Sequence, residues 1–431
     1  MRIERLFKLS FFLLPLPLLG MSYLQKEFQI NCQDMILASS KDNNFRVTQE
    51  LPLIDSKTKS FIKAASGLRF YDNPELNAEK ALDQKIHLLV AQDSSRYLGI
   101  ARFNNVTFRE QINKFRKFLS PLITFIPLDT IENIKTLEDP DKDYESHRKK
   151  LKKDYEAMTT LPNGHLLIIG SGSDISKIHT QKKLFRTSAI LLNPMDMSYK
   201  EYMLKNFYDY LNSNKKVVGM ANNHGEPRLN IEGIGVHKEN GEFYISFFHR
   251  SNTNKNYHDT IIQYKLNDWL LYVKKNSSIA FRLKYHKIYR LKFPSVQMTS
   301  GKKNVTLPIS LHDALFGENK LIIPVSAEKD SLDGNGNYVD GHVVFSGIAY
   351  IKFSGKNPEC TIYQSPNDKD PGLVSDFGKI EGIAAFTAKG RNAYERSLLT
   401  EESFVIGIHD VDSEHQPSTM SVLDIKSLLK N

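Results

Sequence analysis

Four acidic residues occupy the same place in a short motif that recurs along the chain. The clearest copies, Asn230 to Ile234 and Lys379 to Ile383, share the order Ile-Glu-Gly-Ile. A related pattern runs from Asp154 to Met158, and a weaker copy ends at Ala314. The acidic residues at this position are Glu156, Glu232, Asp313 and Glu381.

Two kinds of chemistry would explain a repeated carboxylate. Several carboxylates that meet at one axis repel each other and raise each other's pKa unless a cation or hydrogen-bond donors stabilise them. Hard oxygen ligands of this kind suit Ca²⁺ or Mg²⁺, and we predict Ca²⁺ as the cofactor of such a site. Alternatively, each carboxylate accepts hydrogen bonds from backbone amides of a neighbouring unit and clamps the fold.

A second set of polar residues stands where apolar stretches end. Loops at one end of a rigid β scaffold often carry binding residues. The predicted ligand-binding residues are His249, Arg250, Glu328, His409, Asp410 and Asp412. They would contact an anionic or hydroxylated ligand, and the alternative is that they form ordinary solvated turns.

The elements that position these residues are predicted to be β-hairpins. Each motif copy is followed by two apolar runs separated by a polar turn, as in Phe243 to Phe248 and Thr260 to Leu266. Asn240-Gly241 is a strong hairpin signal between two such runs. Ala65 to Leu68 opens the first unit, and Ser198 to Leu211 is expected to be a helical insertion. The fold class predicted is all-β: a single β-propeller of five or six blades with a few short helices.

Composition supports a large folded domain and argues against nucleic-acid binding. The chain has 431 residues, of which 40% are hydrophobic, and a formal net charge of +9. That length and apolar content suffice for a sizeable core. The positive charge is diffuse apart from the run Arg148 to Lys153, and no nucleic-acid-binding motif accompanies it.

The N-terminus has the layout of a secretory signal peptide. Arg2, Arg5 and Lys8 precede the apolar run Phe11 to Leu19 and small residues. The run is too short to span a bilayer, so no transmembrane segment is predicted. The predicted organisation is a signal peptide over 1–21, an N-terminal extension over 22–60 and a propeller over 61–431. The protein is expected to be periplasmic or secreted, and monomeric.

Two cysteines, Cys32 and Cys360, lie far apart in the sequence. An oxidising compartment would permit a bridge between them, and a propeller brings its chain ends together. Pairing also requires suitable geometry, so both the bridge and two free thiols remain open.

The chain resembles an uncharacterised bacterial propeller family that is labelled a domain of unknown function. The resemblance covers about 60 to 425 and rests on Lys153 to Ala157, Asn230 to Gly233, Glu381-Gly382 and Asp410 to Ser418. It implies a propeller and no established activity. More distantly, the Glu-Gly openings are similar to those of phytase-like esterases and gluconolactonase-type propellers. The latter implies that a Glu of the opening helps to hold a divalent metal.

Two functions follow from these patterns. The first is an exported propeller that binds a small or extended ligand at its channel mouth without catalysis. The alternative is a divalent-metal-dependent hydrolase of phosphoesters or lactones. No pair of nucleophile and base is evident, and a metal-activated water would need neither. We therefore assign no catalytic residues from the sequence.

Overall fold

The computed structural model describes the strands and the four helices whose bounds are given below. The described residues are 26–36, 46–55, 65–71, 85–92, 97–104, 122–127, 154–173, 186–218, 229–251, 259–275, 283–300, 303–332, 338–353, 358–365, 378–387, 390–410, 418–425 and 428–429. The predicted ligand-binding residue Asp412 and the predicted signal peptide lie outside these residues.

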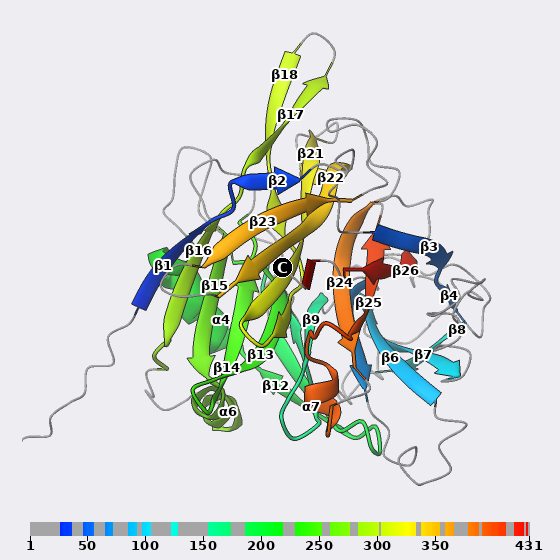
Figure 1. The fold of residues 1–431 in the computed structure, drawn as a ribbon. Helices are drawn as coiled ribbons and strands as arrows, with labels where there is room; N and C mark the ends of the chain where they lie inside the picture. Colours follow the sequence, from blue (N-terminus) through cyan, green and yellow to red (C-terminus); the bar gives the residue numbers. More distant parts are fainter. Residues whose placement is uncertain are drawn as a thin grey trace, which may run out of the picture.

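Two sheets occupy the middle of the chain, and their strands are antiparallel except for β1, which runs parallel to β16 (Figure 1). The β9 sheet contains β9 (Tyr155–Thr160), β10 (Leu166–Gly170), β11 (Ser188–Leu192) and β12 (Tyr199–Met203). The β13 sheet contains β13 (Ile231–Glu239), β14 (Glu242–His249), β15 (Asp259–Lys265) and β16 (Lys287–Lys292), with β1 (Lys26–Asn31) at its edge. Asn240 and Gly241, both with positive φ, form the predicted turn between β13 and β14.

Two further sheets follow towards the C-terminus. The β21 sheet contains β19 (Ser310–Leu311), β20 (Leu315–Gly317), β21 (Lys320–Leu332), β22 (Tyr338–Lys352), β23 (Glu359–Gln364) and β2 (Asp34–Ile36). The β24 sheet contains β24 (Lys379–Phe386), β25 (Phe404–Asp410), β26 (Thr419–Asp424) and β3 (Arg46–Pro52). The ribbon of β17 (Ser295–Ser300) and β18 (Lys303–Pro308) projects from the body.

A fifth sheet is described mainly by its backbone pairing. The β5 sheet contains β5 (Ala65–Tyr71), β6 (Lys85–Gln92), β7 (Tyr97–Asn104), β8 (Leu122–Pro127) and β4 (Ile54–Asp55). The first strands of the sheets lie side by side: β5 contacts β9 and β24, β9 contacts β13, and β20 contacts both β13 and β24.

The predicted mostly-β, propeller-like architecture is therefore confirmed. The predicted number of five or six blades is not confirmed. Four sheets are described with most of their side chains, and the β5 sheet is described mainly by its backbone. The ribbon of two strands is too small to count as a further blade.

The N-terminal strands form an edge belt around the ring, which we define as residues 26–55. Along this belt β1 pairs with β16, β2 with β23, β3 with β26 and β4 with β8. Figure 1 shows these blue strands on the outer edges of successive sheets. The belt therefore covers backbone groups of sheet edges that would otherwise be unpaired.

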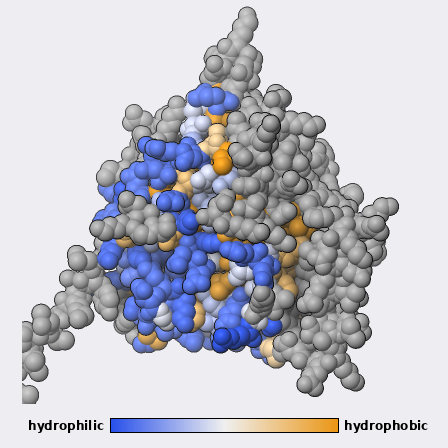
Figure 2. All heavy atoms as spheres, in the orientation of Figure 1, coloured by the Kyte–Doolittle hydropathy of each residue, from blue (hydrophilic) through white to orange (hydrophobic). Residues whose placement is uncertain are grey.

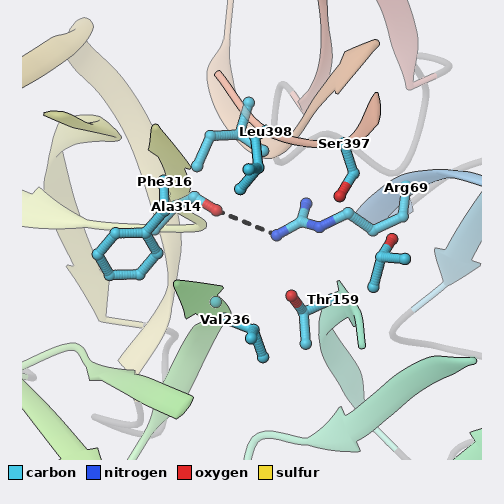
Figure 3. Close-up of a pocket in the computed structure, with 10 residues that line it drawn as sticks. Arg69, Thr159, Val236, Ala314, Phe316, Ser397 and Leu398 are labelled. Carbon is cyan, nitrogen blue, oxygen red and sulfur yellow. Dashed lines mark hydrogen bonds between the residues drawn. The ribbon is translucent and has the colours of Figure 1, made fainter. Parts of the chain in front are cut away.

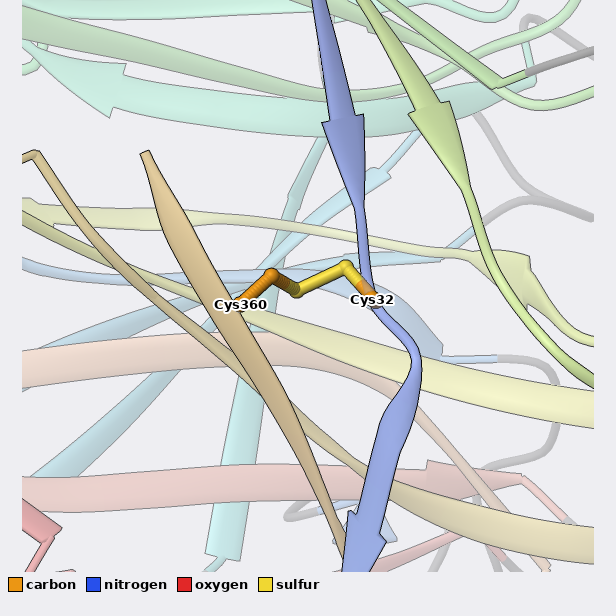
Figure 4. The surroundings of a disulfide bond; sticks show 2 residues. All are labelled: Cys32 and Cys360. Atoms are coloured by element: carbon orange, nitrogen blue, oxygen red, sulfur yellow. A yellow bond between two sulfur atoms is a disulfide. The ribbon is translucent and has the colours of Figure 1, made fainter. Parts of the chain in front are cut away.

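A disulfide joins the edge belt to the β21 sheet. Cys32 lies between β1 and β2, and it is bonded to Cys360 of β23 with a Cα–Cα distance of 4.7 Å (Figure 4). Both cysteines are buried. The sequence left open whether the two cysteines pair, and in the structure they do. The pairing of β2 with β23 next to them brings the two residues together.

Helices cover only a small part of the structure. They are α4 (Lys205–Ser213), α5 (Lys215–Val218), α6 (Leu266–Lys274) and α7 (Ala393–Arg396). Phe207 of α4 and Trp269 of α6 pack against Phe247 of β14 in the largest apolar cluster. The helix predicted from Ser198 was wrong in its first part, because Tyr199–Met203 pairs with β11 as an edge strand.

The described helices do not include one that is both long and apolar enough to cross a membrane. On the face drawn in Figure 2, hydrophilic side chains predominate where the β13 sheet lies, with single hydrophobic residues scattered among them.

Candidate functional site

The Glu-Gly motif marks a β-bulge at the start of an innermost strand. The pairing of β13 with β14 skips Glu232, that of β24 with β25 skips Glu381, and that of β9 with β10 skips Glu156. The pairing of β5 with β6 skips Ser66 in the same way. An unpaired bulge residue can aim its side chain away from the sheet, which brings equivalent positions of neighbouring sheets together.

The glycines that follow Glu232 and Glu381 are required by the closeness of the next strand, whereas Ala157 follows Glu156. A Cβ atom on Gly233 would lie 3.0 Å from Cα of Asp313, and one on Gly382 would lie 2.7 Å from the carbonyl oxygen of Ser66. These contacts are with backbone atoms, which cannot move aside cheaply. The repeated sequence motif therefore records close packing of innermost strands.

The fourth copy of the motif is shifted by one residue from the position predicted. Leu311 pairs with Val325 and Leu315 pairs with Ile322, so one extra residue lies between them. Aligning Leu311 with the paired residues Ile231 and Ile380 places His312 at the bulge position. Asp313 then takes the place of the glycine.

Six charged or titratable side chains meet where these innermost strands begin, and we call them the entrance cluster. Its members are Glu232, Arg250, His312, Glu328, Lys379 and Glu381. Glu232, His312 and Glu381 each offer one donor atom, and these three atoms lie within 4.8 Å of one another. The side chains of Arg250 and Glu328 are 17% and 10% exposed, so little of the cluster is accessible to solvent.

The cations of the entrance cluster each bridge two carboxylates. Arg250 lies 2.6 Å from Oε1 of Glu328 and 3.6 Å from Oε1 of Glu232. Lys379 lies 2.8 Å from Oε1 of Glu381 and 3.5 Å from Oε1 of Glu328. Two cations thus face three carboxylates, which leaves one net negative charge when His312 is neutral.

These contacts divide the carboxylates into two kinds. Burial raises the pKa of Glu232, with the attraction of Arg250 opposing it. Burial also acts on Glu328, but Arg250 and Lys379 outweigh it and lower the pKa of that carboxyl to about 2. The pKa of Glu381 is lowered as well, since Lys379 and His312 overcome the effect of burial. Neighbouring carboxyl groups whose pKa values are shifted in opposite directions are common at functional sites and also in structural ion-pair networks.

Asp313 lies in a different environment from the entrance cluster. Its oxygens accept hydrogen bonds from Arg69 at 2.6 and 2.9 Å and from the amide of Ile383 at 3.1 Å. Arg69 also donates to the carbonyls of Ile234 and Ala314. This pair therefore links four innermost elements and fits the clamp interpretation of a repeated carboxylate.

A small pocket lies beside Arg69 (Figure 3). Figure 3 shows Arg69 reaching across it to the carbonyl of Ala314, with Thr159, Val236 and Leu398 around it. The guanidinium is fully engaged by Asp313 and by backbone carbonyls. It therefore has little capacity to hold an anion there.

The remaining predicted metal and ligand residues are placed differently. Glu156 stands at a bulge but does not belong to the three-residue donor group. His249 and His409 are buried and pair with Ile231 and Ile380, opposite the bulges. Burial lowers the pKa of His249 to about 4 and that of His409 to about 3. Asp410 ends β25 and is partly exposed.

Three important residues were missed by the sequence reasoning. His312 and Lys379 belong to the entrance cluster, and Arg69 holds Asp313. Lys379 and His312 could have been found by aligning the motif copies on the apolar residue before the glutamate. No sequence signal distinguished Arg69.

Comparison with solved structures gives distant matches. A levansucrase variant from B. megaterium is 11% identical, with 93% of this chain and 89% of that chain covered and a TM-score of 0.33. A mannose phosphorylase from Leishmania mexicana is 10% identical, with 93% and 88% covered and a TM-score of 0.31. A Synechocystis apocarotenoid oxygenase variant is 11% identical, with 86% and 61% covered and a TM-score of 0.26. At these scores none of them bears on function.

No curated protein matches the sequence. A match to a protein family covers residues 116–422, which is most of the chain and includes the whole entrance cluster. The uncharacterised family expected from the sequence is thereby supported, whereas nothing in these matches is evidence for the expected similarity to phytases or gluconolactonases. The chain belongs to DUF6929, a family of unknown function.

Proposed function

We propose that this protein binds a small or extended hydroxylated ligand at the entrance cluster. The observation that carries the proposal is the meeting of donors and acceptors of both signs on rigid strands. Arg250 and Lys379 can donate hydrogen bonds, and the carboxylates of Glu232, Glu328 and Glu381 can accept them. Sugars and polyols present both groups at short spacing.

The charge balance favours a neutral ligand over an anion. Three carboxylates outnumber Arg250 and Lys379, so an added anion would increase the excess negative charge. A hydroxylated molecule instead exchanges hydrogen bonds with both kinds of group. Because these groups already pair with each other, binding must replace internal contacts, and we expect dissociation constants in the high micromolar to millimolar range.

The test is a binding assay on protein treated with chelator. Saturation-transfer NMR would be recorded with glucose, N-acetylglucosamine and glucose 6-phosphate as probes. We expect the neutral sugars to bind, and Arg250→Gln to weaken binding at least tenfold. Arg186→Gln is the matched control, since Arg186 is similarly buried and pairs with Asp154 instead. Absence of binding to the wild type, or equal binding by the Arg250 variant, contradicts the proposal.

We also propose that binding takes place outside the cytoplasm and on a propeller of five blades. The disulfide between Cys32 and Cys360 supports an oxidising compartment, in which such bonds persist. The β5 sheet supports a fifth blade, because β5 lies between β9 and β24. Its strands pair in the meander order of the other sheets.

A further inference from the structure

We infer that Glu232, His312 and Glu381 form a binding site for a divalent transition-metal ion, with Zn²⁺ or Mn²⁺ preferred over the Ca²⁺ expected from the sequence. This goes beyond the proposed ligand binding and does not depend on it. The inference rests on the orientation of one buried imidazole and on the equivalence of the three positions.

The three side chains converge because of the repeated architecture. Glu232 and Glu381 stand at the bulges of β13 and β24. His312 holds the position aligned with them between β19 and β20, in the neighbouring β21 sheet. Nδ1 of His312 is 3.3 Å from Oε2 of Glu381. Ligands about 2.1 Å from one metal ion lie about 3–3.5 Å apart, so this pair already has a suitable spacing.

The hydrogen bonds of His312 leave Nδ1 directed at the carboxylates. Nε2 lies 2.7 Å from Oγ of Ser326, and that hydroxyl donates to Oε1 of Glu328 at 3.3 Å. When the Ser326 hydroxyl donates to Glu328, it accepts the hydrogen of Nε2, which defines the Nε2–H tautomer of His312. In this tautomer neutral His312 presents a lone pair at Nδ1, and such an outer contact at Nε2 is typical of histidines that bind metals.

In the Nε2–H tautomer, Nδ1 of His312 faces the carboxylate of Glu381 without a hydrogen to donate. His312 is fully buried, and Nδ1 has no hydrogen-bond partner among the described residues. A lone pair facing a carboxylate oxygen at 3.3 Å is unfavourable unless a cation lies between them. The cation is either a proton on the imidazole or a metal ion.

Free carboxylate oxygens are available for a metal. Lys379 contacts Oε1 of Glu381, so Oε2 remains for the ion. Arg250 and Asn230 both contact Oε1 of Glu232. An imidazole nitrogen with two carboxylates suits borderline ions, whereas Ca²⁺ prefers six or more oxygen ligands.

The experiment is metal titration of the chelator-treated full chain by calorimetry, with Zn²⁺, Mn²⁺ and Ca²⁺ in separate runs. We expect one equivalent of Zn²⁺ or Mn²⁺ per chain. His312→Asn and Glu381→Gln should each weaken binding at least tenfold. His237→Asn, which changes another largely buried histidine, should bind as the wild type does. Bound Co²⁺ should show ligand-field absorption that disappears in His312→Asn.

Three results would overturn the inference. They are absence of stoichiometric uptake by the wild type, uptake unchanged in His312→Asn, and stoichiometric uptake of Ca²⁺ alone. Should His312→Asn fail to fold, Glu381→Gln and the wild-type titration still decide. Sugar binding is tested without metal, so the two proposals can fail separately.

Discussion

Arg69 and Asp313 form an ion pair whose side chains are 3% and 0% exposed. Each is surrounded by further hydrogen bonds to backbone groups of neighbouring sheets. Burial raises the pKa of Asp313, and Arg69 opposes that rise. Such a pair contributes little net stability compared with apolar residues, but removal of one member leaves an uncompensated buried charge. At the scale of single residues, this pair and the buried histidines have the clearest consequences.

Removal of one partner of the Arg69–Asp313 pair should therefore be costly. We expect Asp313→Asn to lower the free energy of unfolding by about 3–5 kcal/mol. The double variant Arg69→Leu with Asp313→Asn should lose less than the sum of the single losses. Urea unfolding at pH 7 measures both. Asp209→Asn removes the exposed Lys205–Asp209 pair and should change stability by less than about 0.5 kcal/mol.

His409 should make the fold sensitive to mild acid. Its folded pKa of about 3 lies below the ordinary value of 6.5, so only the unfolded chain gains a proton as the pH falls below about 6.5. Stability is thus fully present above that pH and decreases below it, by about 2 kcal/mol per such histidine at pH 5. His409→Gln should lose about that much less between pH 7 and pH 5 in urea unfolding.

The comparison must be made between variants, because other groups titrate in the same window. His249 acts in the same direction as His409, with a folded pKa of about 4. Burial raises the pKa of Asp259 to about 7, which stabilises the folded state as the pH falls and opposes the histidines. Equal losses for the wild type and His409→Gln would contradict the assignment of His409.

At the scale of elements, the edge belt links the outer edges of the sheets to one another. Four short strands within 26–55 join four different sheets, and one disulfide fixes the belt between the first two. The strands in contact with β1, β2 and β3 are the last strands of their sheets. The belt is therefore held by pairing along its length and by a covalent bond near its beginning.

Loss of the disulfide should loosen the edge belt without unfolding the ring. The bond joins residues separated by 328 positions, and its removal should cost about 2–4 kcal/mol. For a chain of this size we expect Tm to fall by about 2–5 °C. Scanning calorimetry of Cys32→Ser with Cys360→Ser measures this. Reductant should lower Tm of the wild type and leave that of the double variant unchanged; equal responses would contradict the prediction.

At the scale of the whole molecule, the ring and the belt begin after the predicted signal peptide. β1 starts at Lys26, a few residues beyond the expected cleavage position. Removal of 1–21 would thus leave every described strand intact. We expect the disulfide to form after export, in an oxidising compartment.

Export should be visible in the mass of the mature protein. We expect a chain that begins near residue 22 when the protein is recovered from its native host, together with a mass 2 Da lower than that of the reduced form. Intact-mass spectrometry with and without reduction measures both. Recovery of a chain that retains Met1, or of two free thiols, would contradict export.

The sequence by itself determined the class of fold and the residues that open its units. The alternation of apolar runs and turns specified hairpins, and the Glu-Gly motif recorded a bulge next to a closely packed strand. These are local properties, since periodicity and turn chemistry act within a few residues. The same reasoning reached Glu232 and Glu381, which the structure brings together.

Only the tertiary structure decided which partners these residues have. His312 replaced Asp313 at the bulge because the register of β19 and β20 with β21 differs by one residue from the predicted alignment. Arg69 met Asp313 across 244 positions of sequence, and the Cys32–Cys360 bond depended on the pairing of β2 with β23. Contacts between distant segments follow from sheet packing around a common axis, which no local pattern encodes.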